Sequence, residues 1–419
     1  MNRTPLFDWH VSQGAVMTEF RGWEMPLWYS AGAVAEHRAV VTAAGLFDTS
    51  HMSVVVIKGP GAFNLLQKCF TRDLPACTGG GKKPLRPGAS VFGAYLNEAG
   101  GVVDDTILYR ADEQSYISIV NCGMGEAIRA HLIGRAGGEP VEVSDLTGKV
   151  GKIDLQGPSS AKILAKVLDE PMKALDDMKY FSFKGHFDGN DSQADTRLKD
   201  GTPILLSRTG YTGEFGFEIL LEPERLLSSW KMIMDAGKDF GAVPCGLAAR
   251  DSLRAGAVLP LSGQDIGPWP FVNHPWPYAL PYTEDKSAFT KKFIGDEALL
   301  KNENAPYTHA VAGYDPRKVS TRVPAVVLDC GGREIGTVLT CTADMAVGWY
   351  EGRILSLTSP GRPQDFKPKG LMCGLVKVKS RLSPGEAVVL QDRKRKIKAV
   401  IVEDVRPDRT ALRPMHEML

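Results

Sequence analysis

The pattern of apolar residues changes at about Pro306, and this change limits the possible folds more than any other feature of the chain. Before it, β-branched runs at 52–59 (MSVVVIKG) and 115–122 (SYISIVNC) alternate with runs of helical spacing at 61–70 and 125–136. After it, only short strand-like runs follow, such as AVVLD, REIGTVLTC and EAVVLQD, with turn residues between them. The pattern therefore predicts an α+β region with mixed sheets and helices, followed by a small β-barrel or sandwich.

The length of 419 residues exceeds the usual size of one hydrophobic core, so two or three domains are expected. We place a first region of two lobes at residues 1–285 and a separate domain at 306–419. Near the boundary, segment 267–282 (GPWPFVNHPWPYALPY) contains five prolines. Because proline fixes φ and lacks a backbone donor, this segment is expected to be an ordered loop at the surface or at the mouth of a cleft.

The formal net charge is only +1, which gives no reason to expect a nucleic acid or an anionic membrane as the main partner. The basic run at 392–398 (DRKRKIK) lies between two strand-like runs and contains no aromatic residue, so it predicts a solvated hairpin tip. No stretch of about 18 apolar residues occurs, and the start of the chain lacks the apolar core of a signal peptide, so no membrane span is expected.

The seven cysteines are scattered and never spaced as C-x-x-C. This distribution is typical of reduced thiols in a cytoplasmic protein. The eight histidines form no zinc-binding pattern, so no metal site is expected.

Two adjacent aspartates, Asp104 and Asp105, follow a glycine turn in NEAGGVVDDTILY (97–109). Because TILY continues as a strand, the two side chains should point to opposite faces, one of them inward or into a cleft. A carboxyl group against an apolar wall has a raised pKa, which suits a proton acceptor near neutral pH. Capping of the turn by both aspartates is the alternative that the residues alone leave open.

The stretch SRTGYTGEFGFEIL (207–220) combines glycines, aromatic residues and one late carboxylate, Glu218. In a strand over 214–222, the two phenylalanines share one face, and Glu214, Gly216 and Glu218 share the other. Gly216 would leave a gap beside Glu218, where the carboxylate could accept two parallel hydrogen bonds from the N–C–N edge of a pterin or a guanidinium. The alternative is a strand that follows a turn and carries a salt-bridged glutamate.

A helix predicted between Pro244 and Pro260 carries Arg250 and Arg254 on one face. Asp251 lies three residues before Arg254 and can pair with it, which leaves Arg250 to meet an anion. Solvation of both arginines is equally consistent with the spacing.

An ordered series of motifs resembles the aminomethyltransferase (T-protein) family of the glycine cleavage system. The series covers nearly the whole chain, and the order makes the resemblance specific although each fragment alone is weak. The motifs are RTPLFDWHVSQGAVMTEFRGWEMPLWY (3–29), GLFDTSHM (45–52), LNEAGGVVDDTILYR (96–110), IVN (119–121), LQGP (155–158), SRTGYTGEFGFE (207–218), GLAARDSLR (246–254) and LSGQDI (261–266), with a weaker match in GREIGTVLT (332–340).

The resemblance implies a ring of three lobes around tetrahydrofolate, which would act as a co-substrate. It implies that Asp105 lies near the reacting N5 of the pterin as the catalytic acid–base group, and that Glu218 binds the amino-pyrimidine edge of that ring. The remaining implied folate contacts are Tyr211, Asn121, Tyr109, Arg250 and Met52.

The implied reaction joins an aminomethyl group to tetrahydrofolate and releases ammonia. The group would arrive on the lipoyl arm of a carrier protein, the H-protein. No metal or flavin is required, and positioning of two large substrates should dominate catalysis.

Some segments depart from the family pattern. The usual T-N-D reads Thr71-Arg72-Asp73, the proline-rich segment 267–282 replaces a different segment that lines the central cavity, and a longer segment lies between Ala343 and Leu371. A related tetrahydrofolate-dependent N-, O- or S-demethylase with another one-carbon donor is therefore a second hypothesis. A non-catalytic folate-binding factor for iron–sulfur assembly is a third, and it is less expected because SRTGYTGEFG lacks the cysteine of that group's motif.

Overall fold

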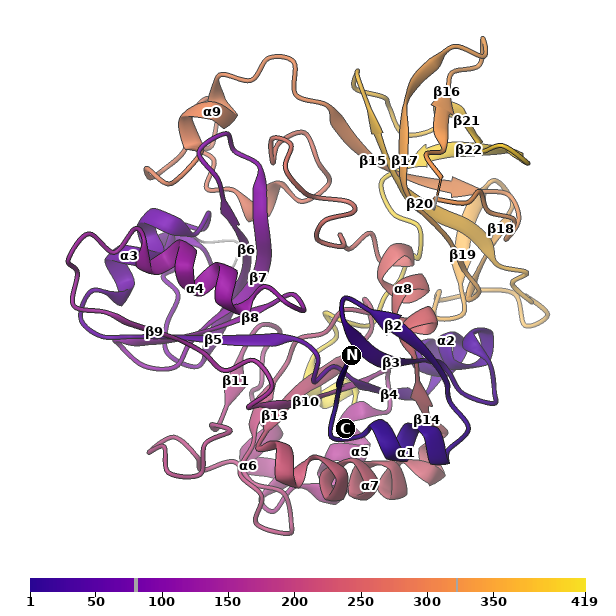
Figure 1. Cartoon of the computed structure of the whole chain (residues 1–419). Coiled ribbons are helices and arrows are strands. Elements are labelled where there is room, and N and C mark those ends of the chain that lie inside the picture. Colours follow the sequence, from indigo (N-terminus) through magenta and orange to yellow (C-terminus); the bar gives the residue numbers. More distant parts are fainter. Residues whose placement is uncertain (79–81, 322) are drawn as a thin grey trace.

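A six-stranded mixed sheet, a five-stranded antiparallel sheet and a closed barrel make up most of the molecule (Figure 1). The structure, a computed structural model, describes residues 1–78, 82–321 and 323–419. Each sheet has its own helices, and the barrel stands beyond both of them in the last third of the chain.

The first sheet has six strands in the order β11-β12-β13-β10-β4-β14. Alternate residues of β13, among them Phe217 and Ile219, enter a core with Trp230 of α7. The burial of these side chains confirms the aromatic face that was predicted for the stretch GEFGFEIL. The strands are β4 (Ala44–Asp48), β10 (Gly151–Gln156), β11 (Phe183–Lys184), β12 (Leu205–Ser207), β13 (Gly216–Leu221) and β14 (Ala242–Cys245); the helices beside them are α5 (Ser160–Val167), α6 (Pro171–Leu175) and α7 (Leu226–Gly237).

The second sheet has five antiparallel strands in the order β6-β7-β8-β5-β9. Leu65 and Leu66 of one helix and Ile128 of another pack on one of its faces. The strands are β5 (Ser53–Lys58), β6 (Ala89–Leu96), β7 (Val102–Arg110), β8 (Ser115–Val120) and β9 (Glu142–Asp145); the helices are α3 (Ala62–Cys69) and α4 (Gly125–Ile133). The strands and helices predicted from the first part of the sequence are therefore confirmed.

The two sheets share a smaller apolar core on the faces turned away from these helices. Tyr109 and Ile117 of the five-stranded sheet contact this core, as do Leu205 and Leu220 of the six-stranded sheet. Alternation along β7 and β13 thus sends one set of side chains to the helices and the other set to the neighbouring sheet.

The N-terminal segment and helix α8 connect these sheets to the barrel. α8 (Leu247–Gly256) ends before Pro260, as predicted, and packs on α2, β3 and the barrel strand β17. Pro244 belongs to β14 and not to the helix. The N-terminal elements are β1 (Asn2–Arg3), α1 (Phe7–Ser12), β2 (Val16–Phe20), β3 (Trp23–Trp28) and α2 (Ala33–Thr42).

The proline-rich segment 267–282 is irregular, as predicted. Its only helical turn in the described chain is η4 (Pro277–Ala279), while Phe271 and Trp276 are buried in a core shared with the barrel. Burial of these aromatic rings explains why a segment without regular hydrogen bonding is ordered. A short helix, α9 (Asp296–Leu300), follows it.

The C-terminal domain contains a closed barrel in the order β15-β20-β17-β16-β21-β22. This result confirms the barrel and excludes the sandwich. The run DRKRKIK lies at the turn between β21 and β22, which confirms the predicted hairpin tip. The barrel strands are β15 (Tyr307–Gly313), β16 (Val326–Leu328), β17 (Glu334–Asp344), β20 (Leu371–Val378), β21 (Ala387–Gln391) and β22 (Lys396–Val402), and a hairpin of β18 (Val347–Tyr350) and β19 (Arg353–Ser356) lies between β17 and β20.

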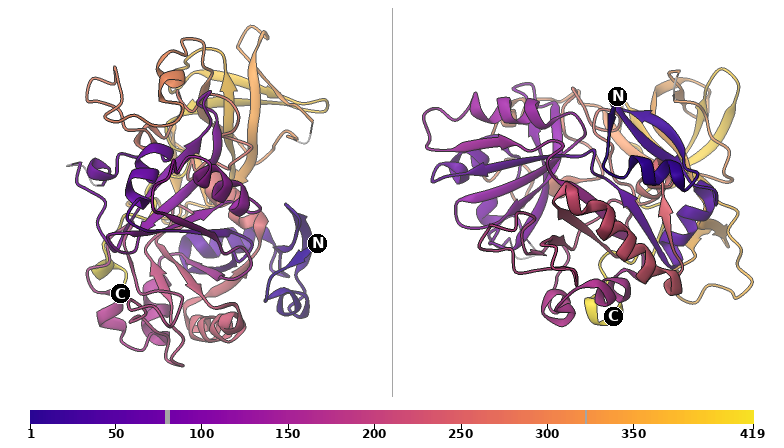
Figure 2. Two further views of the ribbon diagram at one scale, coloured as in Figure 1. Left: turned by 60° about the vertical axis from the view of Figure 1, so that its left-hand side comes forward. Right: turned by 60° about the horizontal axis from the view of Figure 1, so that its bottom comes forward.

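After β22 the chain leaves the barrel and returns to the six-stranded sheet (Figure 2). Met415 and Met418 enter the same core as Leu6, near the other end of the chain. The guanidinium of Arg208 donates to the backbone oxygens of Ala411 and Arg413, at 3.0 Å each. The tail is therefore part of the first region in packing although it follows the barrel in sequence.

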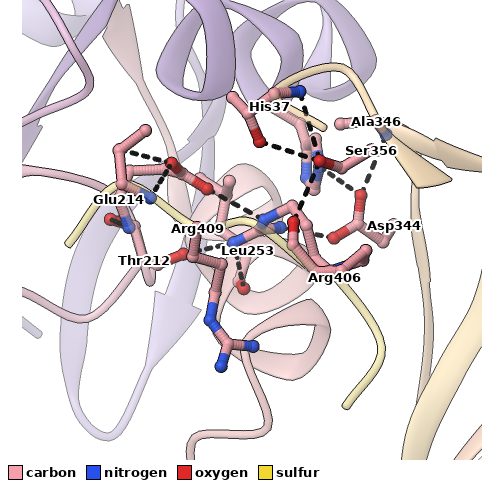
Figure 3. A network of polar contacts seen from close by, with 12 residues as sticks. His37, Thr212, Glu214, Leu253, Asp344, Ala346, Ser356, Arg406 and Arg409 are labelled. Carbon is pink, nitrogen blue, oxygen red and sulfur yellow. Dashed lines mark hydrogen bonds and ion pairs between the residues drawn. The ribbon is translucent and has the colours of Figure 1, made fainter. Parts of the chain in front are cut away.

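A buried polar network joins the barrel to the first region (Figure 3). Arg406, from the returning tail, is fully buried and pairs with Asp344 of β17 and with Glu214, the latter at 2.9 Å. His37 of α2 bonds to Asp344 at 2.8 Å. The expectation that Glu214 shares the face of Glu218 is wrong, because β13 begins only at Gly216 and the preceding loop turns Glu214 toward Arg406.

Candidate functional site

A cavity of about 1740 Å³ is lined by residues of both sheets, α8 and the barrel domain. Its volume exceeds the roughly 300–1,000 Å³ that one drug-sized ligand fills, so it has room for two substrates. Six of the seven predicted site residues line it: Met52, Asp105, Asn121, Tyr211, Glu218 and Arg250. The seventh, Tyr109, does not line the cavity but is buried behind Glu218.

Asp105 of β7 lines the cavity, whereas Asp104 is buried behind it. The burial alternates as expected for a strand, yet the Asn121 side-chain amide reaches both carboxylates, donating to Asp104 Oδ1 at 2.8 Å and to Asp105 Oδ1 at 2.9 Å. Ser262 also donates to Asp104, at 2.9 Å. These contacts exclude simple turn capping as the role of the pair.

Burial, followed by the nearby Asp104 carboxylate, raises the pKa of Asp105 to about 7. Burial also raises the pKa of Asp104, although hydrogen bonds from Asn121 and Ser262 act to lower it. Two carboxyl groups that share one amide lose their protons in linked steps. The cavity-facing member can therefore exchange a proton near neutral pH.

Glu218 of β13 is held by three side chains. Lys152 of β10 forms an ion pair with Glu218 Oε1, and Thr209 donates to Oε2. The hydroxyl of Tyr109 donates to the same Oε2 at 3.3 Å. These contacts use three of the about four acceptor sites of a carboxylate, so one site on Oε1 remains for a ligand in the cavity that Glu218 lines.

The gap expected beside Gly216 does not exist. A Cβ at Gly216 would lie 2.5 Å from Oε1 of Gln156, whose side chain already fills this space. Gln156 is fully buried and donates to the backbone oxygens of Thr209 and Phe217. Gly216 thus makes room for the side chain of Gln156. A flat ligand that contacts Glu218 has to approach it from another part of the cavity.

Arg250 of α8 is not left without a partner, contrary to the expectation from helix spacing. Its Nη1 forms an ion pair with Asp154 at 2.8 Å, and Asp154 is fully buried. The guanidinium also lies over the ring of Tyr211, 4.9 Å from the ring centre. Tyr211 in turn donates through its hydroxyl to the backbone oxygen of Pro260, so both residues form a fixed part of the cavity wall.

The predicted pair of Asp251 and Arg254 is confirmed, at 2.7 Å. Arg254 is fully buried and also pairs with Asp265. It therefore anchors α8 to the loop that follows the helix.

Sequence reasoning missed His51, Lys152 and Asp154. Lys152 and Asp154 alternate with apolar residues in β10, and this polar face of a buried strand was a readable signal. His51 lines the cavity, and its Nδ1 has no hydrogen-bond partner in the described chain. Burial, followed by the nearby Arg250, lowers the pKa of His51 to about 4, so its ring is neutral at physiological pH.

Two of the three unusual segments reach the cavity. Arg72 and Tyr278 both line it. Segment 343–371 contributes no lining residue, and the backbone oxygens of Met345 and Pro368 instead accept hydrogen bonds from Arg38 of α2. The described residues contain no group of His, Cys, Asp and Glu side chains placed to hold a metal ion. Nor does any helix among them have the length and apolar character that a membrane span requires.

Comparison with known proteins identifies the family. The family model described as GCVT N-terminal domain matches residues 6–269. An aminomethyltransferase of Caldanaerobacter subterraneus subsp. tengcongensis is 34% identical over 319 residues, which cover 75% of this chain and 77% of the relative. An aminomethyltransferase of Halothermothrix orenii is 30% identical over 405 residues, covering 96% of this chain and 99% of the relative.

The fold agrees with these matches. The crystal structure of glycine cleavage system aminomethyltransferase T from Bartonella henselae superimposes with a TM-score of 0.74 at 28% sequence identity, and the match covers 96% of each chain. The predicted fold and the predicted class of enzyme are thereby confirmed, and the chain belongs to the aminomethyltransferase family.

Proposed function

We propose that the chain transfers a one-carbon unit from an aminomethylated lipoyl carrier protein to tetrahydrofolate, with release of ammonia. The observation that carries this proposal is that Glu218 and Asp105 line the same cavity in a chain of this family. Glu218 is a fixed hydrogen-bond acceptor for the amino-pyrimidine edge of a pterin, and Asp105 is an acid–base group that titrates near neutral pH.

The chemistry needs no oxidant. Two protons move from the two reacting folate nitrogens to the leaving ammonia and the lipoyl sulfur, while one methylene group changes carriers. Asp105 can accept a proton from folate and later return it, because its pKa of about 7 keeps both forms populated. Asn121 would hold the Asp105 carboxylate in place during this exchange.

Other residues of the cavity wall would hold the substrates in position. Arg250 and Tyr211 form one fixed part of the wall, because the guanidinium pairs with Asp154 and the tyrosine hydroxyl donates to the backbone oxygen of Pro260. Their fixed positions support catalysis by orientation of two large substrates.

Met52 lines the same cavity and supplies apolar surface to it.

A demethylase that uses another one-carbon donor is the second candidate. The observation that favours it is the presence of Tyr278, from the unusual segment 267–282, in the cavity wall. The third hypothesis, a folate-binding factor without catalysis, predicts equal, small losses of tetrahydrofolate affinity and of turnover when Asp105 is replaced by Asn. The cytoplasmic location stays a prediction that rests on the seven free cysteines.

Turnover with aminomethylated lipoyl carrier protein and tetrahydrofolate tests the proposal. The expected result is release of ammonia and formation of methylenetetrahydrofolate in equal amounts. Tetrahydrofolate binding without either product would reject the glycine-cleavage reaction and favour the demethylase. Absence of tetrahydrofolate binding would reject both folate-dependent candidates.

A further inference from the structure

Arg72 brings a positive charge to the cavity wall without a carboxylate to balance it. Among the described residues, its side chain donates only to the backbone oxygen of Cys77. The neighbouring Asp73 is already used, because it accepts hydrogen bonds from Gln67 at 2.9 Å and from Thr290 at 2.7 Å. A guanidinium that is partly removed from water and unpaired is favourable only if an anion can reach it.

Arg72 lies close to the strand pair that carries Asp105. Its side chain crosses Gly93 of β6, where an added Cβ would come 2.9 Å from Arg72 Cγ. In the β6–β7 register, Gly93 pairs with Thr106 and the next residue, Ala94, pairs with Asp105. Because paired residues share a face, the stem of Arg72 lies on the face of Gly93 and Thr106, opposite to that of Ala94 and Asp105. Arg72 packs at the edge strand of the sheet and still lines the cavity that Asp105 lines.

Two aromatic rings line the cavity beside Arg72. Phe92 of β6 and Tyr278 have ring centres 6.2 Å apart, and Tyr278 leaves 52% of its surface exposed. The charged groups near Tyr278 include Arg72, Arg409 and Asp105. Arg409 already pairs with Asp404, so Arg72 is the arginine of this group that lacks an acidic partner in the described chain.

We propose that Arg72, Phe92 and Tyr278 form a subsite for a carboxylate attached to an aromatic group. The inference rests on the proposed function and deepens it, because tetrahydrofolate carries a glutamate joined to an aminobenzoyl ring. The two rings would contact the aminobenzoyl group, and the guanidinium would pair with a glutamate carboxylate.

A comparison of two ligands tests the subsite. Calorimetry under anaerobic conditions would measure binding of tetrahydrofolate and of tetrahydropteroate, which lacks the glutamate. Arg72→Gln should weaken tetrahydrofolate binding about 10- to 100-fold, because it removes a charge-assisted hydrogen bond. The same variant should change tetrahydropteroate binding less than about twofold, and Arg72→Lys should lose less affinity for tetrahydrofolate than Arg72→Gln.

Arg129→Gln is the matched control, since Arg129 is exposed on α4 and pairs with Glu126. It should leave both affinities unchanged. Equal losses for both ligands, or no loss for either, would overturn the subsite. If Arg72→Gln instead raised the KM for a carboxylate-bearing donor such as sarcosine with tetrahydrofolate binding intact, the assignment to glutamate would fall. If the wild-type protein binds tetrahydropteroate as tightly as tetrahydrofolate, only this inference is rejected. If it binds neither ligand, the proposed function is rejected as well.

Discussion

Lys152 Nζ and Glu218 Oε1 form a buried ion pair between the neighbouring strands β10 and β13. The same Nζ pairs with Asp154, so one cation balances two carboxylates. Lys152→Met should therefore destabilise the fold by about 3 kcal/mol, because it leaves Glu218 buried without its charge partner. Urea unfolding measures this loss. Lys231→Met, at an exposed position of α7, is the control and should change stability little. Equal stability of the two variants would contradict the importance of the pair.

Glu218→Gln should weaken tetrahydrofolate binding about 10- to 100-fold. The reason is that a neutral amide replaces a charged acceptor and offers only one oxygen to the ligand. Calorimetry checks the affinity, with exposed Glu224→Gln as the control. An affinity within about threefold of the wild type would reject Glu218 as a contact of the pterin.

Asp105→Asn should lower kcat by about 100-fold or more with a small effect on tetrahydrofolate affinity, since general acid–base groups contribute roughly 10²–10⁴ to a rate. In the wild type, the rate should rise as the pH rises through about 7, where Asp105 loses its proton. The pH profile of the variant should lack this step. Similar small losses of rate and affinity would favour a binding protein over an enzyme.

The same variant should be more stable than the wild type at pH 8. The folded-state pKa of Asp105 is raised to about 7, so between about pH 4 and 7 the folded protein holds a proton that the unfolded chain has lost. Wild-type stability therefore falls as the pH rises through this window, and Asp105→Asn removes a cost of roughly 1–3 kcal/mol above it. The difference in the free energy of unfolding between the variant and the wild type, measured in urea, should be smaller at pH 5 than at pH 8. Asp365→Asn, at an exposed position, should show no such pH dependence.

Arg406→Met should destabilise the protein by about 3–5 kcal/mol, because it leaves Asp344 and Glu214 buried without a cation. Thermal unfolding checks this, and Arg317→Met at an exposed ion pair is the control. A loss no larger than that of the control would mean that the network in Figure 3 is not needed to hold the barrel in place.

Local periodicity was sufficient to predict the strands, the helices and the barrel. It also placed Glu218 and Phe217 on opposite faces of β13, since alternation depends only on the strand itself. The errors concern partners from distant segments. Gln156 fills the space at Gly216 and Asp154 pairs with Arg250, and both come from β10, whose approach depends on the folded sheet.

The position of the C-terminal tail sets the order in which the molecule can be completed. Met415 and Met418 belong to the same core as Leu6, so the first lobe lacks part of its interior until residues 415–418 have been synthesised. Residues as far as Met418 must therefore have left the ribosome before that lobe closes, whereas the barrel, whose strands end at Val402, can form earlier.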